Sequence, residues 1–219
     1  MVNKLRFLLL FLVVLISFGL TNTTHGVEQL REDTDDIDRM NWGEDLPRDN
    51  AIAVKKYRKA ANQGSVEAQF DLGSMYYSGQ GVPQDYAEAV KWFRKAAEQG
   101  SVEAQYNLAS MYYMGQGVPQ DYGESVKWFR KVAEQGSASA QFNLGLMYLR
   151  GVGVQKNNTE AYAWWSIAAA SGHENAEKGR DEISEILFPE ALAAASQRAT
   201  ELIEEIEARR DLQDKKAGF

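Results

Sequence analysis

Few side chains in this sequence are suited to catalysis or metal binding, and they are widely spaced. The 219 residues include no cysteine and two histidines, His25 and His173. A zinc site takes about four nitrogen, sulfur or oxygen ligands. Because His25 lies in the N-terminal segment, His173 would have to share a metal with scattered carboxylates, and we interpret it as a surface residue at a helix start. We therefore expect no metal, no other cofactor, no disulfide and no cysteine nucleophile.

Three Gly-x-Gly sequences raise the question of a phosphate site; they are Gly79–Gly81, Gly115–Gly117 and Gly151–Gly153. A phosphate-binding loop of this kind follows a strand and opens a helix. These glycines follow predicted helices instead, so we interpret them as turn residues. No serine stands in the strand-to-helix motif of a serine hydrolase. We predict no catalytic residue and no enzyme activity.

A group of tryptophans raises a further possibility, a platform for carbohydrate. The group consists of Trp92, Trp128, Trp164 and Trp165. The first three occupy one position of a repeated sequence, where packing between repeats is the expected role. We interpret the remaining residue of the Trp164–Trp165 doublet as a cover for the end of the repeat array.

The dominant feature of the sequence is a 36-residue repeat. Residues 65–100 and 101–136 differ at seven positions, so 29 of 36 are identical, and residues 137–172 are a looser third copy. A fixed period of this length is typical of a solenoid, in which each unit buries its apolar face against its neighbours. We predict an all-α solenoid of about three and a half helix pairs over residues 49–172.

Each repeat is predicted to hold two helices, which we name helix A and helix B. In the first full copy, helix A covers about residues 66–78 and helix B about residues 86–99. Gly79 can take the positive φ angle that ends a helix, Pro83 stops helix A, and Asp85 suits the N-cap of helix B. Apolar residues spaced three and four apart give each helix one buried face. On helix A these are Ala68, Leu72 and Met75, with counterparts in the later copies.

Shorter elements flank the full repeats. Residues 49–64 match helix B of each repeat and are predicted to form a half repeat that opens the solenoid. Two helices, at about 174–187 and 189–210, are predicted to cap the other end as a unit of residues 173–210. Solenoids need such terminal units with a polar outer surface to stay soluble. We expect residues 211–219 to be a tail.

One set of helix-A side chains avoids the predicted core and forms a stripe. In the first copy its members are spaced i, i+4, i+7 and i+11, which places them on one face of the helix. They vary between copies while the core repeats, so we predict that they bind an extended peptide, with Tyr77 and Tyr113 alongside. The alternative is a plain solvated helix face. The stripe consists of Glu67, Asp71, Ser74, Ser78, Glu103, Asn107, Ser110, Met114, Ser139, Asn143, Leu146 and Arg150.

The charge of this stripe changes along the array. It is acidic at Glu67, Asp71 and Glu103 and basic at Arg150. A partner segment should therefore carry the opposite order of charges.

The repeated sequence resembles a known family. Residues 104–136 read AQYNLASMYYMGQGVPQDYGESVKWFRKVAEQG, which is similar to the Sel1-like repeat, a 36-residue relative of the tetratricopeptide repeat. The resemblance rests on the alanine and leucine of helix A, on MYY followed by GxGVPQDY, and on VKWFRKAAEQG in helix B. It covers roughly residues 49–172 and implies a right-handed α-solenoid of antiparallel helix pairs, whose concave surface, lined by helix A, binds proteins or peptides.

The resemblance also bears on cellular role. Exported bacterial members of this family are associated with envelope assembly, cell-wall enzymes, exopolysaccharide regulation and host entry. A cysteine-rich branch with β-lactamase or penicillin-binding claims relies on one disulfide per repeat. This chain has no cysteine, so we do not carry that activity over.

The N-terminal residues 1–26 have the three-part layout of a secretory signal peptide. Lys4 and Arg6 precede an apolar run over residues 7–20, and polar residues follow. We expect cleavage after Gly26 or after Gly19, with an uncleaved membrane anchor as the alternative. In either case the repeats would lie outside the cytoplasm.

The charge balance limits the classes of partner. The chain has 31 acidic and 24 basic residues and a net charge of −7, which argues against nucleic acid and against anionic membrane surfaces as partners. Much of the acidity lies in residues 27–48, which show no helical period and are predicted to be a flexible linker.

These features predict an exported, non-enzymatic module, periplasmic or secreted, that acts as a monomer. It would bind a protein or peptide partner on its concave helix-A face, in envelope assembly, regulation or host interaction. One alternative is a cell-wall protein that binds or hydrolyses peptidoglycan through carboxylates and tryptophans. Another is a regulator that inhibits a membrane sensor from outside.

Overall fold

The computed structural model describes the backbone of residues 46–217. The predicted signal segment, residues 1–26, and residues 27–45 of the predicted linker lie outside the described part. Backbone contacts divide the chain into Met1–Arg48 and Asp49–Phe219, and every side chain described below belongs to the second unit.

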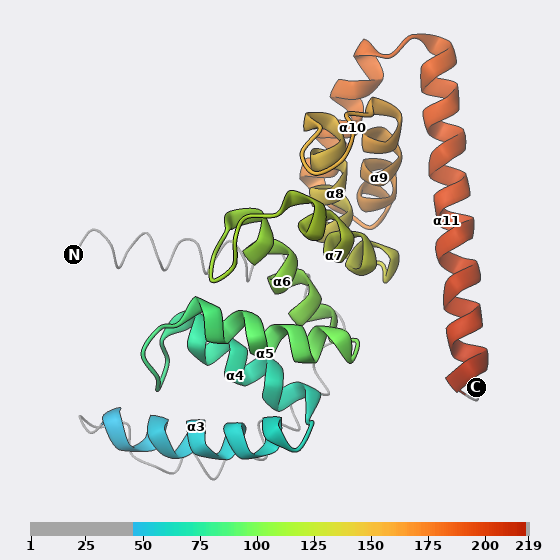
Figure 1. Ribbon diagram of the computed structural model, residues 1–219. Helices are drawn as coiled ribbons and strands as arrows, with labels where there is room; N and C mark the ends of the chain where they lie inside the picture. Colours follow the sequence, from blue (N-terminus) through green and yellow to red (C-terminus); the bar gives the residue numbers. More distant parts are fainter. Residues whose placement is uncertain (1–45, 218–219) are drawn as a thin grey trace. The chain divides into compact units, whose positions relative to one another are not determined.

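Residues 46–217 form helices joined by short turns, with no strand in that range (Figure 1). This confirms the all-α prediction. The helices are α3 (Leu46–Asn62), α4 (Val66–Ser78), α5 (Tyr86–Glu98), α6 (Val102–Met114), α7 (Tyr122–Glu134), α8 (Ala138–Arg150), α9 (Asn158–Ala170), α10 (Glu174–Ile186) and α11 (Pro189–Ala217).

The helices follow the predicted solenoid plan. Helices α4, α6 and α8 are the A helices of three repeats, and α5, α7 and α9 are their B helices. Each A helix packs on its own B helix, and α5 and α7 also pack on the A helix of the next repeat. The helix bounds agree with the prediction to within a residue at α4 and α5. At the start, α3 begins at Leu46, so the last three residues of the predicted linker are helical.

The predicted turn residues define where each helix begins and ends. Gly79 follows α4 with φ 76°, and the Asp85 carboxylate accepts the backbone N–H of Glu88 at 3.0 Å at the start of α5. Gly117 has φ 71°, and a Cβ there would lie 2.2 Å from the backbone oxygen of Tyr86. Glycine is therefore required at that turn, because successive repeats touch through it.

Small residues allow the helices to approach closely. Ala104 and Leu108 of α6 are fully buried, as are their counterparts in α8. A Cβ on Gly73 would lie 2.7 Å from the ring of Phe93. Gly73 therefore lets α4 approach its own helix B more closely than a residue with a Cβ would allow at the present position of the Phe93 ring.

A ladder of glutamine side chains links successive repeats. Gln69, Gln105 and Gln141 are buried. Each donates a side-chain N–H to the carbonyl eight residues earlier, at 2.9 to 3.1 Å. In the first two repeats the amide oxygen is also satisfied, because Gln99 donates to Gln69 and Gln135 to Gln105, both at 2.7 Å. The ladder satisfies buried polar groups at each repeat boundary.

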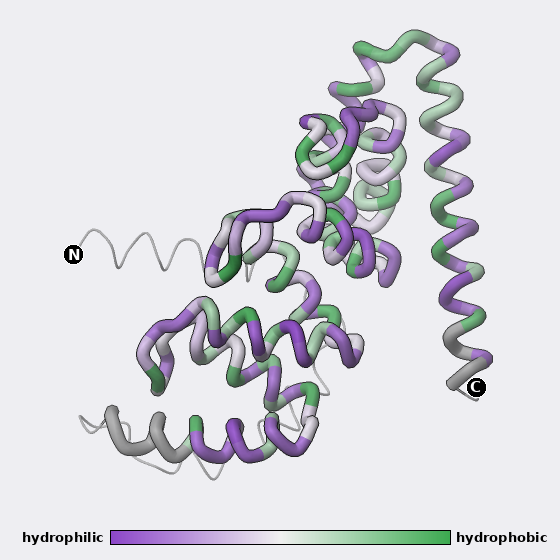
Figure 2. The backbone as a smooth tube through the Cα atoms, in the orientation of Figure 1, coloured by the Kyte–Doolittle hydropathy of each residue, from purple (hydrophilic) through white to green (hydrophobic). Residues whose placement is uncertain are grey.

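The C-terminal helices close the array in a different way from a fourth repeat. Helix α10 carries Lys178 and Arg180 where the repeats have an aromatic residue and a leucine. Helix α11 packs mainly against α9, the B helix of the preceding repeat. It buries Ala195, Ala199, Leu202 and Ile206 and presents charges on its other side, so that hydrophobic and hydrophilic residues alternate along it (Figure 2).

Two details of α11 differ from the prediction. The helix continues to Ala217 rather than ending at Arg210, so most of the predicted tail, residues 211–219, is helical. The apolar spacing of the sequence predicts that Ile203 shares the buried side with Leu202 and Ile206, but Ile203 is 39% exposed.

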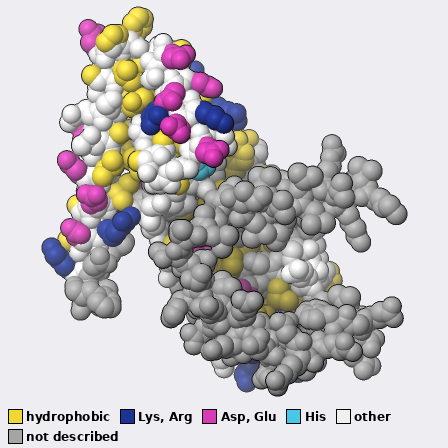
Figure 3. All heavy atoms as spheres, turned by 180° about the vertical axis from the view of Figure 1, so that it is seen from behind, with side chains coloured by type: hydrophobic (Ala, Val, Ile, Leu, Met, Phe, Trp, Pro, Cys, Tyr) yellow, Lys and Arg dark blue, Asp and Glu magenta, His cyan; other side chains and the backbone are white. Residues whose placement is uncertain are grey.

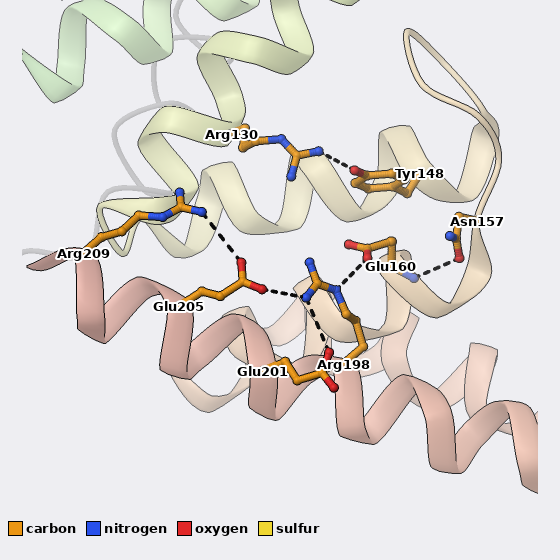
Figure 4. Close-up of polar contacts among 8 residues, drawn as sticks. All are labelled: Arg130, Tyr148, Asn157, Glu160, Arg198, Glu201, Glu205 and Arg209. Atoms are coloured by element: carbon orange, nitrogen blue, oxygen red, sulfur yellow. Dashed lines mark hydrogen bonds and ion pairs between the residues drawn. The ribbon is translucent and has the colours of Figure 1, made fainter.

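Ion pairs hold α11 along the array (Figure 4). Arg198 donates to Glu160 of α9 at 2.7 Å and also to Glu205 at 2.9 Å. Farther along, Arg209 pairs with Glu134 of α7. Partial burial lowers the pKa of Arg198, but hydrogen bonds to the two carboxylates outweigh it and raise the pKa above its ordinary value. Helix α11 is therefore fixed to the B helices of two repeats.

Hydrophobic side chains gather at the end of the molecule where α10 turns into α11 (Figure 3). Ile186 and Phe188 are exposed there, while Leu187 packs against the cluster that includes Trp165 and Ile183.

Candidate functional site

The predicted stripe residues lie on the A helices α4, α6 and α8, and we call the surface that they form the helix-A face. Glu67 and Glu103 are exposed, while Asp71, Asn107 and Asn143 are half-buried. Ser139, the counterpart of Glu67 in the third repeat, is buried with 8% exposure. Contrary to the prediction, Ser139 therefore does not lie on the exposed part of this face.

The serines of the face are half-buried and bond to their own helices. Ser74 donates to the carbonyl of Phe70 at 3.0 Å, and Ser78 donates to the carbonyl of Ser74 at 2.8 Å. Ser110 does the same with the carbonyl of Tyr106 at 3.1 Å. Their hydroxyl oxygens keep acceptor capacity.

Five residues of the stripe line one pocket between α6 and α8, which we call the α6–α8 pocket. Its volume is about 220 Å³. The predicted stripe residues among its lining are Ser110, Met114, Asn143, Leu146 and Arg150. The remaining stripe residues, from Glu67 to Asn107, do not line it. The pocket thus combines side chains from the A helices of two adjacent repeats.

Sequence reasoning missed part of the lining. Phe129 of α7 and Met147 of α8 are buried, and they line the pocket together with Val152 of the following turn. Tyr113, predicted to lie alongside the stripe, completes the wall. Phe129 and Met147 have counterparts 36 residues earlier, so the repeat pattern predicted that they belong to the core. Val152 follows α8 and was predicted to be part of a turn.

The polar side chains of the pocket differ in the contacts that they make with the rest of the chain. Asn143 donates its side-chain N–H to the hydroxyl of Tyr106 at 3.0 Å, which fixes its orientation. Tyr113 packs edge-on against Tyr122, with ring centroids 5.3 Å apart. Arg150, at the C-terminal end of α8, is exposed and makes no ion pair within residues 46–217. The pocket therefore has a fixed apolar wall and a positive charge that is available to a ligand.

The first repeat presents the opposite charge. Burial is the main reason that the pKa of Asp71 rises to about 6, and the neighbouring Glu67 carboxylate adds to the shift. The pKa of Tyr57 on α3 is also raised, by burial and then by the charge of Asp71. Negative charge is thus crowded at the N-terminal end of the helix-A face.

His173 lies at a helix start, as predicted, but it is half-buried rather than fully exposed. Its Nδ1 accepts the backbone N–H of Ala176 at 3.2 Å, so the imidazole caps α10. Its ring stacks on Phe142 with centroids 4.6 Å apart, and burial lowers its pKa. Within residues 46–217, no group of three or more metal-binding side chains is arranged around a common point.

The tryptophans pack inside the array, as predicted. Trp92, Trp128 and Trp164 are buried, and Lys95 lies over the Trp92 ring at 4.1 Å. Trp165 donates its indole N–H to the carbonyl of Phe142 at 2.9 Å. None of these rings forms an open stacking platform.

No helix of the described part, residues 46–217, has the length and apolar character needed to cross a bilayer.

Solved structures with the same repeats are similar to this chain. One is c5321, "a protective antigen present in uropathogenic Escherichia coli strains displaying an SLR fold", with 34% identity and a TM-score of 0.63. The match covers 72% of this chain and 35% of that protein, so this chain spans about a third of its length. Another is a Sel1 repeat protein from Oxalobacter formigenes, with 39% identity, a TM-score of 0.54, and coverage of 58% of this chain and 96% of that one.

A comparison with curated proteins finds no match. The Sel1 repeat family model matches four times in succession, at residues 40–65, 66–101, 102–137 and 138–173. These matches cover more than half of the chain, and the last three coincide with the helix pairs α4–α5, α6–α7 and α8–α9. The chain therefore belongs to the Sel1 repeat family.

Proposed function

We propose that this chain is an exported, non-enzymatic binding module that holds a protein or peptide partner on its helix-A face. Sel1 repeats are typical of protein–protein interaction modules. The observation that carries the proposal is the α6–α8 pocket, in which variable side chains of two repeats meet over a shared apolar wall. Clefts of this kind, apolar with a few polar groups, are the usual form of binding sites.

The composition of the pocket supports binding rather than hydrolysis. Cleavage of a glycan needs two carboxyl groups on either side of the scissile bond. The pocket is lined by serine, asparagine, arginine, aromatic and aliphatic side chains and by no carboxylate. The acidic residues of the face, Glu67, Asp71 and Glu103, all lie on one row of helices and do not oppose one another.

The proposed location is the periplasm or the exterior of a bacterial cell. Its support is the layout of residues 1–26. The roles that fit are envelope assembly, regulation and host interaction. The similarity to a protective antigen of uropathogenic strains favours a place that an immune system can reach.

An affinity experiment tests the proposal. The chain from Val27 to Phe219 serves as bait in envelope extract, beside a variant that carries both Asp71→Lys and Asn107→Lys. We expect the unmodified chain to retain a defined partner and the variant to lose it, without a fall in the melting temperature.

Two results would count against the proposal. In one, the variant melts earlier yet captures the partner as before, which would make these side chains structural. In the other, the purified chain releases fragments from peptidoglycan, which would support the cell-wall enzyme instead.

A further inference from the structure

The two walls of the α6–α8 pocket come from equivalent positions of different repeats but are chemically unlike. Leu146 of α8 is the counterpart of Ser110 of α6, and Arg150 is the counterpart of Met114. All four line the same pocket. The site is therefore specific to the boundary between the second and third repeats.

The pocket as a whole is large enough for one side chain. Its volume is about 220 Å³, and a dry cavity of about 150 Å³ lined by apolar residues accommodates a benzene molecule. Phe129, Leu146 and Met147 supply the apolar surface. A leucine or phenylalanine side chain of a partner would bury its area there.

The charged part of the pocket selects the group beside that side chain. Arg150 has a planar guanidinium that pairs with a carboxylate through two hydrogen bonds. Among the residues that the structure describes, no carboxylate lines the pocket. A partner carboxylate next to its apolar anchor would therefore be attracted by Arg150 without repulsion from the lining residues.

Asn143, about one turn before Leu146 on α8, supplies a fixed acceptor. The side-chain N–H of Asn143 is engaged by the Tyr106 hydroxyl at 3.0 Å, which leaves the amide oxygen to accept a backbone N–H of a bound peptide. The pocket thus offers three kinds of contact, which come along α8 in the order amide acceptor, apolar side chain and guanidinium.

We propose that the α6–α8 pocket binds a partner peptide by an apolar side chain whose neighbouring carboxylate pairs with Arg150. The carboxylate is either that of an aspartate or glutamate or the C-terminus of the partner chain. This inference rests on the proposed function of the helix-A face and adds the chemistry of its anchor.

Four short synthetic peptides on a glycine–serine frame test the proposal. The first has Leu-Asp with an amidated end, and the second ends in leucine with a free carboxylate. The third has Leu-Asn and the fourth Ala-Asp, both amidated. We expect the first or the second to bind at least about tenfold more tightly than the third and fourth, as measured by fluorescence anisotropy at low salt. Comparison of the first two identifies the source of the carboxylate.

Matched variants of the chain complete the test. Arg150→Met, which restores the residue of the second repeat, should reduce the affinity of the carboxylate peptides to that of the Leu-Asn peptide. Lys156→Gln removes the same charge from an exposed turn position outside the pocket and should leave binding unchanged. Leu146→Ser should weaken every leucine peptide. Because Arg150 is exposed, its variant is expected to stay folded even if Leu146→Ser does not.

The proposal is overturned if the Leu-Asn peptide binds as well as the carboxylate peptides, if Arg150→Met has no effect, or if none of the four binds. Its failure is distinct from that of the proposed function. If the envelope partner is retained by Arg150→Met and Leu146→Ser but lost in the Asp71→Lys, Asn107→Lys variant, the binding module stands and the anchor does not.

Discussion

At the scale of single residues, Asp71 is the side chain with the most unusual environment. It is half-buried on the helix-A face beside Glu67, and its pKa is raised to about 6. The later repeats have asparagine at the same position, Asn107 and Asn143. The first repeat therefore keeps a carboxylate where the others avoid the cost of burying a charge, which is consistent with a role in binding.

The raised pKa predicts a stability effect. Between about pH 4 and 6 the folded chain binds more protons at Asp71 than the unfolded chain, so stability falls as the pH rises through this range. Asp71→Asn removes this loss. We expect the variant to be more stable at pH 7.5 by about 1 kcal/mol, a value reduced for the partial exposure of the carboxylate, and nearly unchanged at pH 4.

Thermal unfolding at the two pH values measures this difference. Glu103→Gln is the matched control, because it removes an exposed acid of the same face and should change stability by less than about 0.5 kcal/mol. An equal gain for Asp71→Asn at both pH values would show that the carboxylate is not the cause.

The limits of sequence reasoning are clearest at this scale. Spacing along helix A predicted that Met114 and Arg150 avoid the core. Both are exposed, because each is the last residue of its helix. The spacing failed for Ser139, since a small hydroxyl fits either surface. It also could not find Phe129 as a pocket residue, because its counterpart in the first repeat, Phe93, is an ordinary core residue.

At the scale of helices, the glutamine ladder has a gap at its last step. The buried side-chain oxygen of Gln141 has no hydrogen-bond partner among the described residues. In the earlier repeats that partner is the glutamine thirty residues later, but here the position is Ser171. An unsatisfied buried acceptor destabilises the fold by roughly 1–3 kcal/mol.

Ser171→Gln is expected to fill this gap. The new amide would donate to Gln141 as Gln135 donates to Gln105, raising the free energy of unfolding by about 1 kcal/mol. Chemical denaturation measures the change. In a Gln141→Leu background the same substitution should give no gain, and a gain of equal size there would mean that the ladder is not responsible.

The bounds of the helices were predictable because the caps are local. Asp85, Gly79 and Pro83 act within a few residues, and the 36-residue period repeats them. The helices against which α11 packs were not predictable from the sequence. The apolar spacing of α11 defines a buried side but does not tell which helix receives it, and the ion pairs that fix it, Arg198 with Glu160 and Arg209 with Glu134, join positions far apart in the sequence.

At the scale of the whole solenoid, α11 closes an array whose stability depends on contacts between neighbouring units. Leu202 is 3% exposed at the contact between α11 and the B helices, while the adjacent Ile203 is 39% exposed. Substitutions at these two adjacent positions therefore test whether the buried side of α11 holds the helix on the array.

Leu202→Asp should release α11 from α9, because it buries a charge without a partner. We expect the C-terminal helix to be cleaved at low protease concentration and the melting temperature to fall by several degrees. Ile203→Asp should leave protection close to that of the unmodified chain. Equal cleavage of the two variants would mean that α11 is not held through its apolar side.

The central claim is that this Sel1 repeat chain binds another protein through its helix-A face. A photo-crosslinking amino acid tests it most directly when placed at Met114, which is 48% exposed at the rim of the pocket, and, for comparison, at Lys127, which is exposed on helix B of the same repeat. On irradiation in cells that export the full chain, we predict a discrete protein adduct from position 114 and none from position 127. An adduct from position 127 with none from position 114 would contradict the account.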